Sequence, residues 1–236
     1  MRFEHKLSMA CCAFSLVMLP AQALTFGSIE LVCPIDGKKF KVNTVLSGTE
    51  LGMWLDMKPI GPTPAPWPLE KCPDNGFIIY KQNFSKAELE TLRPYVQSDG
   101  YRALLDSHTN YYVASRLQIE ARESSARIAT TLLRATWEAR GQEQYLAYAT
   151  EALRWYEQVL KERSPEDKEF VTATLVAGEL ERRLGLFEQA KKRFLGIPDR
   201  KALRSPLDKI VDLQLELIEQ RNAHPARVPT TETKPK

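Results

Sequence analysis

The sequence has 236 residues, of which 43% are hydrophobic and 27% are charged, a globular composition that excludes a collagen-like, mucin-like or wholly disordered chain. Its 33 Lys and Arg residues nearly balance 30 Asp and Glu residues, which leaves a formal charge of +3. Because no basic run is interleaved with aromatic residues, nucleic acid is not expected as the main partner.

Residues 1–23 have the order of a secretory signal peptide. Basic residues precede an apolar stretch over 7–19, and the small residues Ala21 and Ala23 form the pattern of a cleavage site. The apolar stretch is too short to cross a membrane, because a spanning helix needs about 20 apolar residues. We therefore predict cleavage near Ala23, export to the bacterial periplasm and a mature chain without a transmembrane span.

Cleavage leaves two cysteines, Cys33 and Cys72, each at the start of a similar turn. The turns have the sequences CPIDG and CPDNG, and an aromatic residue follows each of them. Short strands are predicted around the turns, because the flanking segments are rich in β-branched and aromatic residues. Five prolines between residues 59 and 68 predict an extended crossing loop. The alternative to a crossing loop is a ligand-binding surface formed by Trp54, Trp67 and the edge of the proline-rich segment.

Each cysteine turn resembles half of a zinc-ribbon knuckle, in which C-P-x-C-G directs two thiolates at one metal ion. The second ligand position is Asp36 in one turn and Asn75 in the other, and a neutral amide is a poor zinc ligand. In a ribbon the two knuckles face each other, so the resemblance implies that the sulfurs of Cys33 and Cys72 meet. In an oxidising compartment we expect a disulfide between them. The alternatives are residual zinc binding through Cys33, Asp36 and Cys72, or free thiols.

The sequence after Phe84 has helical periodicity, and it begins with a capping box between Ser85 and Glu88. Start and stop signals predict helices over 86–97, 100–120, 123–140, 143–162, 166–184, 187–196 and 206–222. His108 lies on an apolar stripe, where a hydrogen-bonded core histidine is favoured over a catalytic one. The mixed charges of 179–183 and the basic residues 191–193 are expected on solvated helix faces.

Residues 171–204 resemble a tetratricopeptide repeat. Gly178 is expected to let the two helices of the repeat approach, and Gly185 is expected to end the first of them. The second helix carries the large-small-large set Phe187, Ala190 and Phe194. A fainter copy of the repeat runs from Trp137 to Tyr156.

The order of two cysteine turns, an F-S-x-x-E-L helix start and repeat-like helices resembles an uncharacterised bacterial family. That family pairs a C-P-x-C-G zinc-ribbon-like module with tetratricopeptide-like helices, and the resemblance implies no reaction. We predict an α+β, mostly α fold of antiparallel helical hairpins behind a small β module. The expected parts are a signal peptide over 1–23, a β-rich ribbon-like module over 24–84, a helical repeat-like domain over 85–223 and a disordered tail over 224–236.

The predicted function is a periplasmic scaffold that binds a protein or peptide partner in a groove of stacked helical hairpins and catalyses no reaction. The sequence contains no nucleophile elbow, H-E-x-x-H motif, Walker loop or dinucleotide fingerprint, and no cofactor is expected. The alternatives are a zinc-binding protein that uses the remnant site at Cys33, Asp36 and Cys72, or an unrecognised cell-envelope enzyme.

Overall fold

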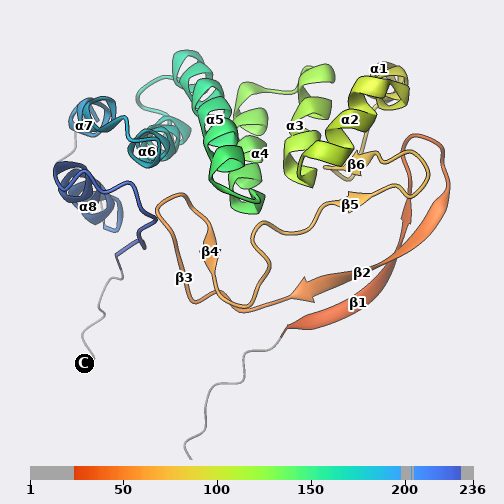
Figure 1. Cartoon of the computed structure of the whole chain (residues 1–236), viewed down its shortest axis with the longest axis horizontal. Helices are drawn as coiled ribbons and strands as arrows, with labels where there is room; N and C mark the ends of the chain where they lie inside the picture. Colours follow the sequence, from red (N-terminus) through yellow and green to blue (C-terminus); the bar gives the residue numbers. More distant parts are fainter. Residues whose placement is uncertain (1–23, 198–202, 204, 230–236) are drawn as a thin grey trace, which may run out of the picture.

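A computed structural model of the chain describes residues 24–197, 203 and 205–229 (Figure 1). The predicted signal peptide over 1–23 and the last part of the predicted tail, 230–236, lie outside the described residues. Within the described part, eight helices and three pairs of antiparallel strands form a mostly helical α+β fold. This confirms the predicted fold class.

The helices follow one another in an arc from α1 to α8, and the strands lie along one side of this arc (Figure 1). The helices are α1 (Lys86–Gln97), α2 (Asp99–Ser107), α3 (Asn110–Glu120), α4 (Ser125–Glu138), α5 (Gln142–Glu162), α6 (Lys168–Arg183), α7 (Phe187–Leu195) and α8 (Leu207–Glu219). The strands are β1 (Thr25–Val32), β2 (Lys39–Ser47), β3 (Gly52–Met53), β4 (Pro59–Ile60), β5 (Glu70–Lys71) and β6 (Ile78–Ile79).

The single helix predicted over 100–120 is wrong, because the structure has two helices, α2 and α3, in this region. The chain leaves the helical conformation at His108 and Thr109, whose ψ angles are 168° and 162°. Apolar residues continue at helical spacing across this break, so periodicity alone could not locate it. Thr109 then becomes the residue that precedes α3.

The cysteine turns share a core with the first helices. Cys33 and Cys72 are buried in one apolar cluster with Leu92 of α1 and Leu117 of α3. A second cluster joins α4, α5 and α6, and a third joins α6, α7 and α8 to Leu55 of the β3–β4 turn. Helix α6 is central to this packing, since every residue from Ala173 to Arg182 is buried.

The predicted disordered tail is wrong for residues 224–229, which are ordered against the β3–β4 hairpin. Leu55 N donates to Ala226 O at 2.9 Å, and Val228 N donates to Met53 O at 2.9 Å. The prolines and charges of this segment indicated disorder. The pairing was missed because composition alone does not show that an edge strand elsewhere in the fold can accept an extended segment. Figure 1 shows this dark blue end of the described chain beside β3.

Candidate functional site

The two cysteine turns face each other, and a disulfide joins Cys33 to Cys72 with their Cα atoms 5.6 Å apart. Both turns have the same backbone: Gly37 N donates to Cys33 O at 2.8 Å, and Gly76 N donates to Cys72 O at 3.0 Å. The φ angles of the two glycines are +76° and +72°, a conformation that glycine adopts readily because it has no Cβ. The predicted disulfide is therefore confirmed. Cys33 and Cys72 occupy the positions at which a zinc knuckle carries its first metal ligand.

The second position of each turn is also occupied by a contact within the chain. Asn75 Nδ2 donates to Asp36 Oδ2 at 3.0 Å and to Cys33 Sγ at 3.4 Å. Asn75 Oδ1 accepts from the amide of Phe77 at 2.9 Å. At the four positions where paired zinc knuckles carry their metal ligands, this chain thus has the Cys33–Cys72 disulfide and the hydrogen bond between Asn75 and Asp36.

This arrangement does not fit a zinc ion. Zinc is bound by thiolates, and the two sulfurs of Cys33 and Cys72 are bonded to each other. Among the described residues, no group of three or more His, Cys, Asp or Glu side chains is arranged to hold a metal ion. Zinc binding through Cys33, Asp36 and Cys72 would require reduction of the disulfide first.

A hollow of about 680 Å³ lies beside the β1–β2 hairpin. It is lined by Ile29, Glu30, Leu31, Val32, Pro34, Thr44, Val45, Leu46, Trp67, Pro68, Glu70, Ile79, Tyr80, Lys81 and Gln82. Three apolar side chains of this lining, Val32, Leu46 and Trp67, are 53%, 52% and 39% exposed to solvent. Exposed apolar surface gathered at a hollow is typical of an interaction site.

The hairpin that forms one wall of the hollow pairs only with itself. In the described part of the chain β1 and β2 make a two-stranded sheet, so each strand keeps a free edge. Ile29 lies opposite Val42 and Leu31 lies opposite Phe40, which gathers apolar side chains on one face. The hairpin therefore has one partly buried apolar face, and it leaves main-chain groups unpaired along its edges.

Trp67 is held at the hollow by the start of α3. Tyr111 Oη donates to Trp67 O at 2.8 Å, and Asn110 Nδ2 donates to Leu69 O at 3.1 Å. The extended proline-rich segment is thus fixed to the helical stack, as expected of a crossing loop. Trp54 does not line this hollow; it pairs with Arg227 of the C-terminal segment instead.

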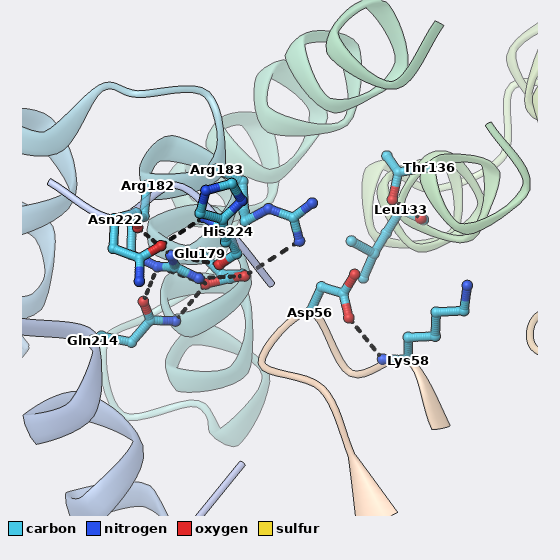
Figure 2. A network of polar contacts seen from close by, with 10 residues as sticks. All are labelled: Asp56, Lys58, Leu133, Thr136, Glu179, Arg182, Arg183, Gln214, Asn222 and His224. Atoms are coloured by element: carbon cyan, nitrogen blue, oxygen red, sulfur yellow. Dashed lines mark hydrogen bonds and ion pairs between the residues drawn. The ribbon is translucent and has the colours of Figure 1, made fainter. Parts of the chain in front are cut away.

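A buried polar cluster, which the sequence did not predict, lies where α6 meets α8 and the C-terminal segment (Figure 2). Arg182 is fully buried and donates to both carboxylate oxygens of Glu179, at 2.7 and 2.9 Å. It also donates to Gln214 Oε1 at 2.9 Å and to the carbonyl oxygens of Asn222 and His224 at 2.5 and 3.0 Å. All three nitrogen atoms of this guanidinium therefore have acceptors, as a buried cation requires.

The expectation that residues 179–183 form a solvated face is wrong, because Glu179, Glu181 and Arg182 are buried. Charges of both signs at helical spacing are common on exposed helices, and the sequence does not reveal that α8 and the C-terminal segment cover this face. The basic spot at 191–193 is also partly used within the fold, since Arg193 donates to Glu181 at 2.7 and 2.8 Å.

Burial raises the pKa values of two carboxylates here, Glu179 within the cluster and Asp56 beside it. Burial raises the pKa of Glu179, and the charge of Arg182 opposes the rise. Burial also raises the pKa of Asp56, on the turn between β3 and β4, while a hydrogen bond from Lys58 N at 3.1 Å opposes it. Figure 2 shows Asp56 on the side of this turn that faces Arg183. Because Glu179 is paired with Arg182 and Gln214, the cluster is suited to joining α6, α8 and the C-terminal segment.

His108 belongs to an aromatic stack between α3 and α5. Its Nδ1 atom lies 3.0 Å from Tyr148 Oη, and its ring stacks on Tyr112 with the centroids 4.2 Å apart. Burial lowers the pKa of His108, which favours the neutral imidazole. These contacts match the interpretation of His108 as a hydrogen-bonded packing residue.

The described residues thus define a mostly helical, disulfide-linked protein with an apolar hollow at its strand-rich front. Residues 71–220 match the family described as uncharacterized proteins conserved in bacteria (DUF2225), and the chain belongs to this family. No curated protein and no solved structure matches the chain. The family match begins at the second cysteine turn, so the β1–β2 wall of the hollow lies outside it. In the described residues, no helix has the length and apolar character needed to span a bilayer.

Proposed function

We propose that the mature chain is an exported periplasmic scaffold that binds an extended apolar segment of a partner protein in the hollow beside the β1–β2 hairpin. The observation that carries the proposal is the exposure of Val32, Leu46 and Trp67 around one hollow. Covering apolar surface stabilises a complex by about 25 cal/mol per Å² before the entropic cost of association. A partner that covers these side chains therefore gains affinity from surface that the free chain leaves in water.

Three charged residues line the hollow, and two of them, Glu30 and Lys81, already have partners within the chain. Glu30 is paired with Lys39 at 2.9 Å, and Lys81 is paired with Glu123 at 2.7 Å. Because these charges already have partners, a charged ligand would have to compete with existing ion pairs. The free edges of β1 and β2 favour an extended segment, which can add main-chain hydrogen bonds to such an edge.

The helices serve as the frame of this site in our proposal. A groove across the stacked helices is less well supported, since α6 is buried over ten consecutive residues. We infer a tetratricopeptide-like pairing for α6 and α7, supported by the close approach of Gly178 to Phe194 and by the positive φ of Gly185, +77°.

Export is supported by two independent features. The first is the order of basic, apolar and small residues in 1–23. The second is the buried Cys33–Cys72 disulfide, because such bonds form and persist in oxidising compartments. The periplasm is the compartment of bacteria that fits both features.

A photoreactive amino acid placed at position 46 tests the proposed site in bacterial cells that express the chain. Position 195 on α7 is the matched control, because Leu195 is 56% exposed and lies outside the hollow. We expect a cross-linked adduct with another protein from position 46 and none from position 195. Adducts of equal yield from both positions, or an adduct formed only with a second copy of this chain, would contradict the proposal.

A further inference from the structure

The C-terminal segment from Asn222 to Pro229 lies in the fold as an extended peptide lies in a binding site. It leaves α8 through Arg221, whose φ is +49°, and then runs beside β3. Three small apolar side chains of the segment, Ala223, Ala226 and Val228, pack against the apolar cluster of α6, α7 and α8. The side chains of His224 and Arg227 are exposed.

The polar contacts that hold this segment use its main chain. Arg182 donates to the carbonyl oxygens of Asn222 and His224, and Leu55 N donates to that of Ala226. The amide of Val228 donates to Met53 O. A site that binds main-chain groups and small side chains accepts any extended peptide with the same spacing of small apolar residues.

Two donors of this site are buried in the structure, with the segment in place. Arg182 on α6 is fully buried, and Leu55 is 2% exposed. If the segment left, one nitrogen of Arg182 would lose both of its acceptors, which costs free energy. A second peptide that supplies two carbonyl oxygens would restore them.

We propose that the surface formed by Met53, Leu55 and Arg182 is a peptide-binding site, occupied in the free protein by the chain's own segment Asn222–Pro229. The partner that it fits is an extended peptide with small apolar side chains at the spacing of Ala223, Ala226 and Val228. This site differs from the hollow beside the β1–β2 hairpin, and the inference does not depend on the function proposed there. The internal segment competes with the partner, so it lowers the apparent affinity of the site.

A peptide with the sequence of residues 222–229, blocked at both ends and labelled with a fluorophore, tests the site by fluorescence anisotropy with the full chain. The variant Val228→Asp weakens the internal segment, because it places a charge among apolar side chains without changing the site itself. His224→Ala is the matched control, since it changes an exposed side chain of the same segment. A second labelled peptide that carries Asp in place of Val228 checks that binding depends on the apolar contact.

We expect saturable binding of the first peptide to the Val228→Asp chain, with an affinity at least about tenfold higher than for the parent chain or the His224→Ala variant. The Asp-containing peptide should bind none of the three. Equal affinity for all three chains, or no saturable binding to the Val228→Asp chain, would overturn the proposal. Loss of the far-ultraviolet circular dichroism of folded helices in Val228→Asp would also overturn it, because the segment would then be an inseparable part of the core.

Discussion

Gly178 on α6 lies directly against the ring of Phe194 on α7. A Cβ atom built at position 178 would come within 2.4 Å of Phe194 Cζ, and the ring is fully buried. Glycine inside a helix costs about 1 kcal/mol relative to alanine. The close approach of the two helices explains why the chain has a glycine here despite that cost.

Gly178→Ala should therefore destabilise the protein. Because the added methyl group overlaps a fully buried ring, we expect the free energy of unfolding in urea to fall by about 1–3 kcal/mol. Gly100→Ala on α2 is the control, since its nearest neighbour would be Ser98 Oγ at 3.9 Å. Helix propensity predicts that the control leaves stability unchanged or raises it by up to about 1 kcal/mol. Similar losses in both variants would contradict this packing.

Arg182→Met should destabilise the fold more strongly, because it leaves the buried carboxylate of Glu179 with only the longer ion pair to Arg183, at 3.9 Å. Removing one partner of a buried ion pair costs about 3–5 kcal/mol. Adding Glu179→Leu to Arg182→Met should recover more than about 1 kcal/mol of that loss, since it removes the buried charge that has lost its closest partner. Unfolding in guanidinium chloride measures both changes. A double variant no more stable than Arg182→Met would show that the pairing does not account for the loss.

Reduction of the Cys33–Cys72 disulfide should lower stability by about 2–4 kcal/mol, because the bond closes a loop of the unfolded chain across 39 residues of sequence separation. Thermal unfolding with and without reductant measures the effect. The variant with both cysteines replaced by serine should unfold like the reduced parent, and reductant should not change it further. A parent insensitive to reductant would be incompatible with the bond.

Glu88 should make the protein more stable above pH 4.5 than at pH 2. The Lys81 ammonium, followed by the amide of Ser85, lowers the pKa of Glu88 from 4.5 to about 2. Since the folded state binds this proton more weakly than the unfolded state, the stabilisation is fully present above pH 4.5 and is lost as the pH falls toward 2.

Glu88→Gln isolates this contribution. At pH 7 it should cost about 1 kcal/mol, because it weakens the capping box and removes the ion pair with Lys81. The difference in unfolding free energy between the parent and the variant should shrink steadily as the pH is lowered from 4.5 to 2.5. A difference that stays constant over this range would contradict the pKa assignment.

Local features of the structure were predictable where neighbouring residues decide them. The capping box of Ser85 and Glu88 is present at the start of α1, and Gly185 has the positive φ expected at a helix end. The disulfide was predictable because the two cysteine turns resemble zinc knuckles, which face each other in a ribbon, and because an oxidising compartment favours the bond.

The features that were missed depend on segments distant in sequence. Arg182 is buried because Gln214 and the carbonyl oxygen of Asn222, more than 30 residues further on, supply its acceptors. The hollow could not be predicted either, since the β1–β2 hairpin, Trp67 and the residues after β6 form it together. Periodicity identifies which helix face is polar, but it does not identify what covers that face.

Export and oxidation of the chain are tested most directly by the intact mass of the protein from the periplasmic fraction, with free thiols alkylated before lysis. We predict the mass of residues 24–236 without an alkyl group, which corresponds to a cleaved leader and a closed disulfide. A full-length protein in the cytoplasmic fraction, with Cys33 and Cys72 alkylated, would contradict this. In that case no envelope partner could reach the hollow, and the two turns would be free to bind metal.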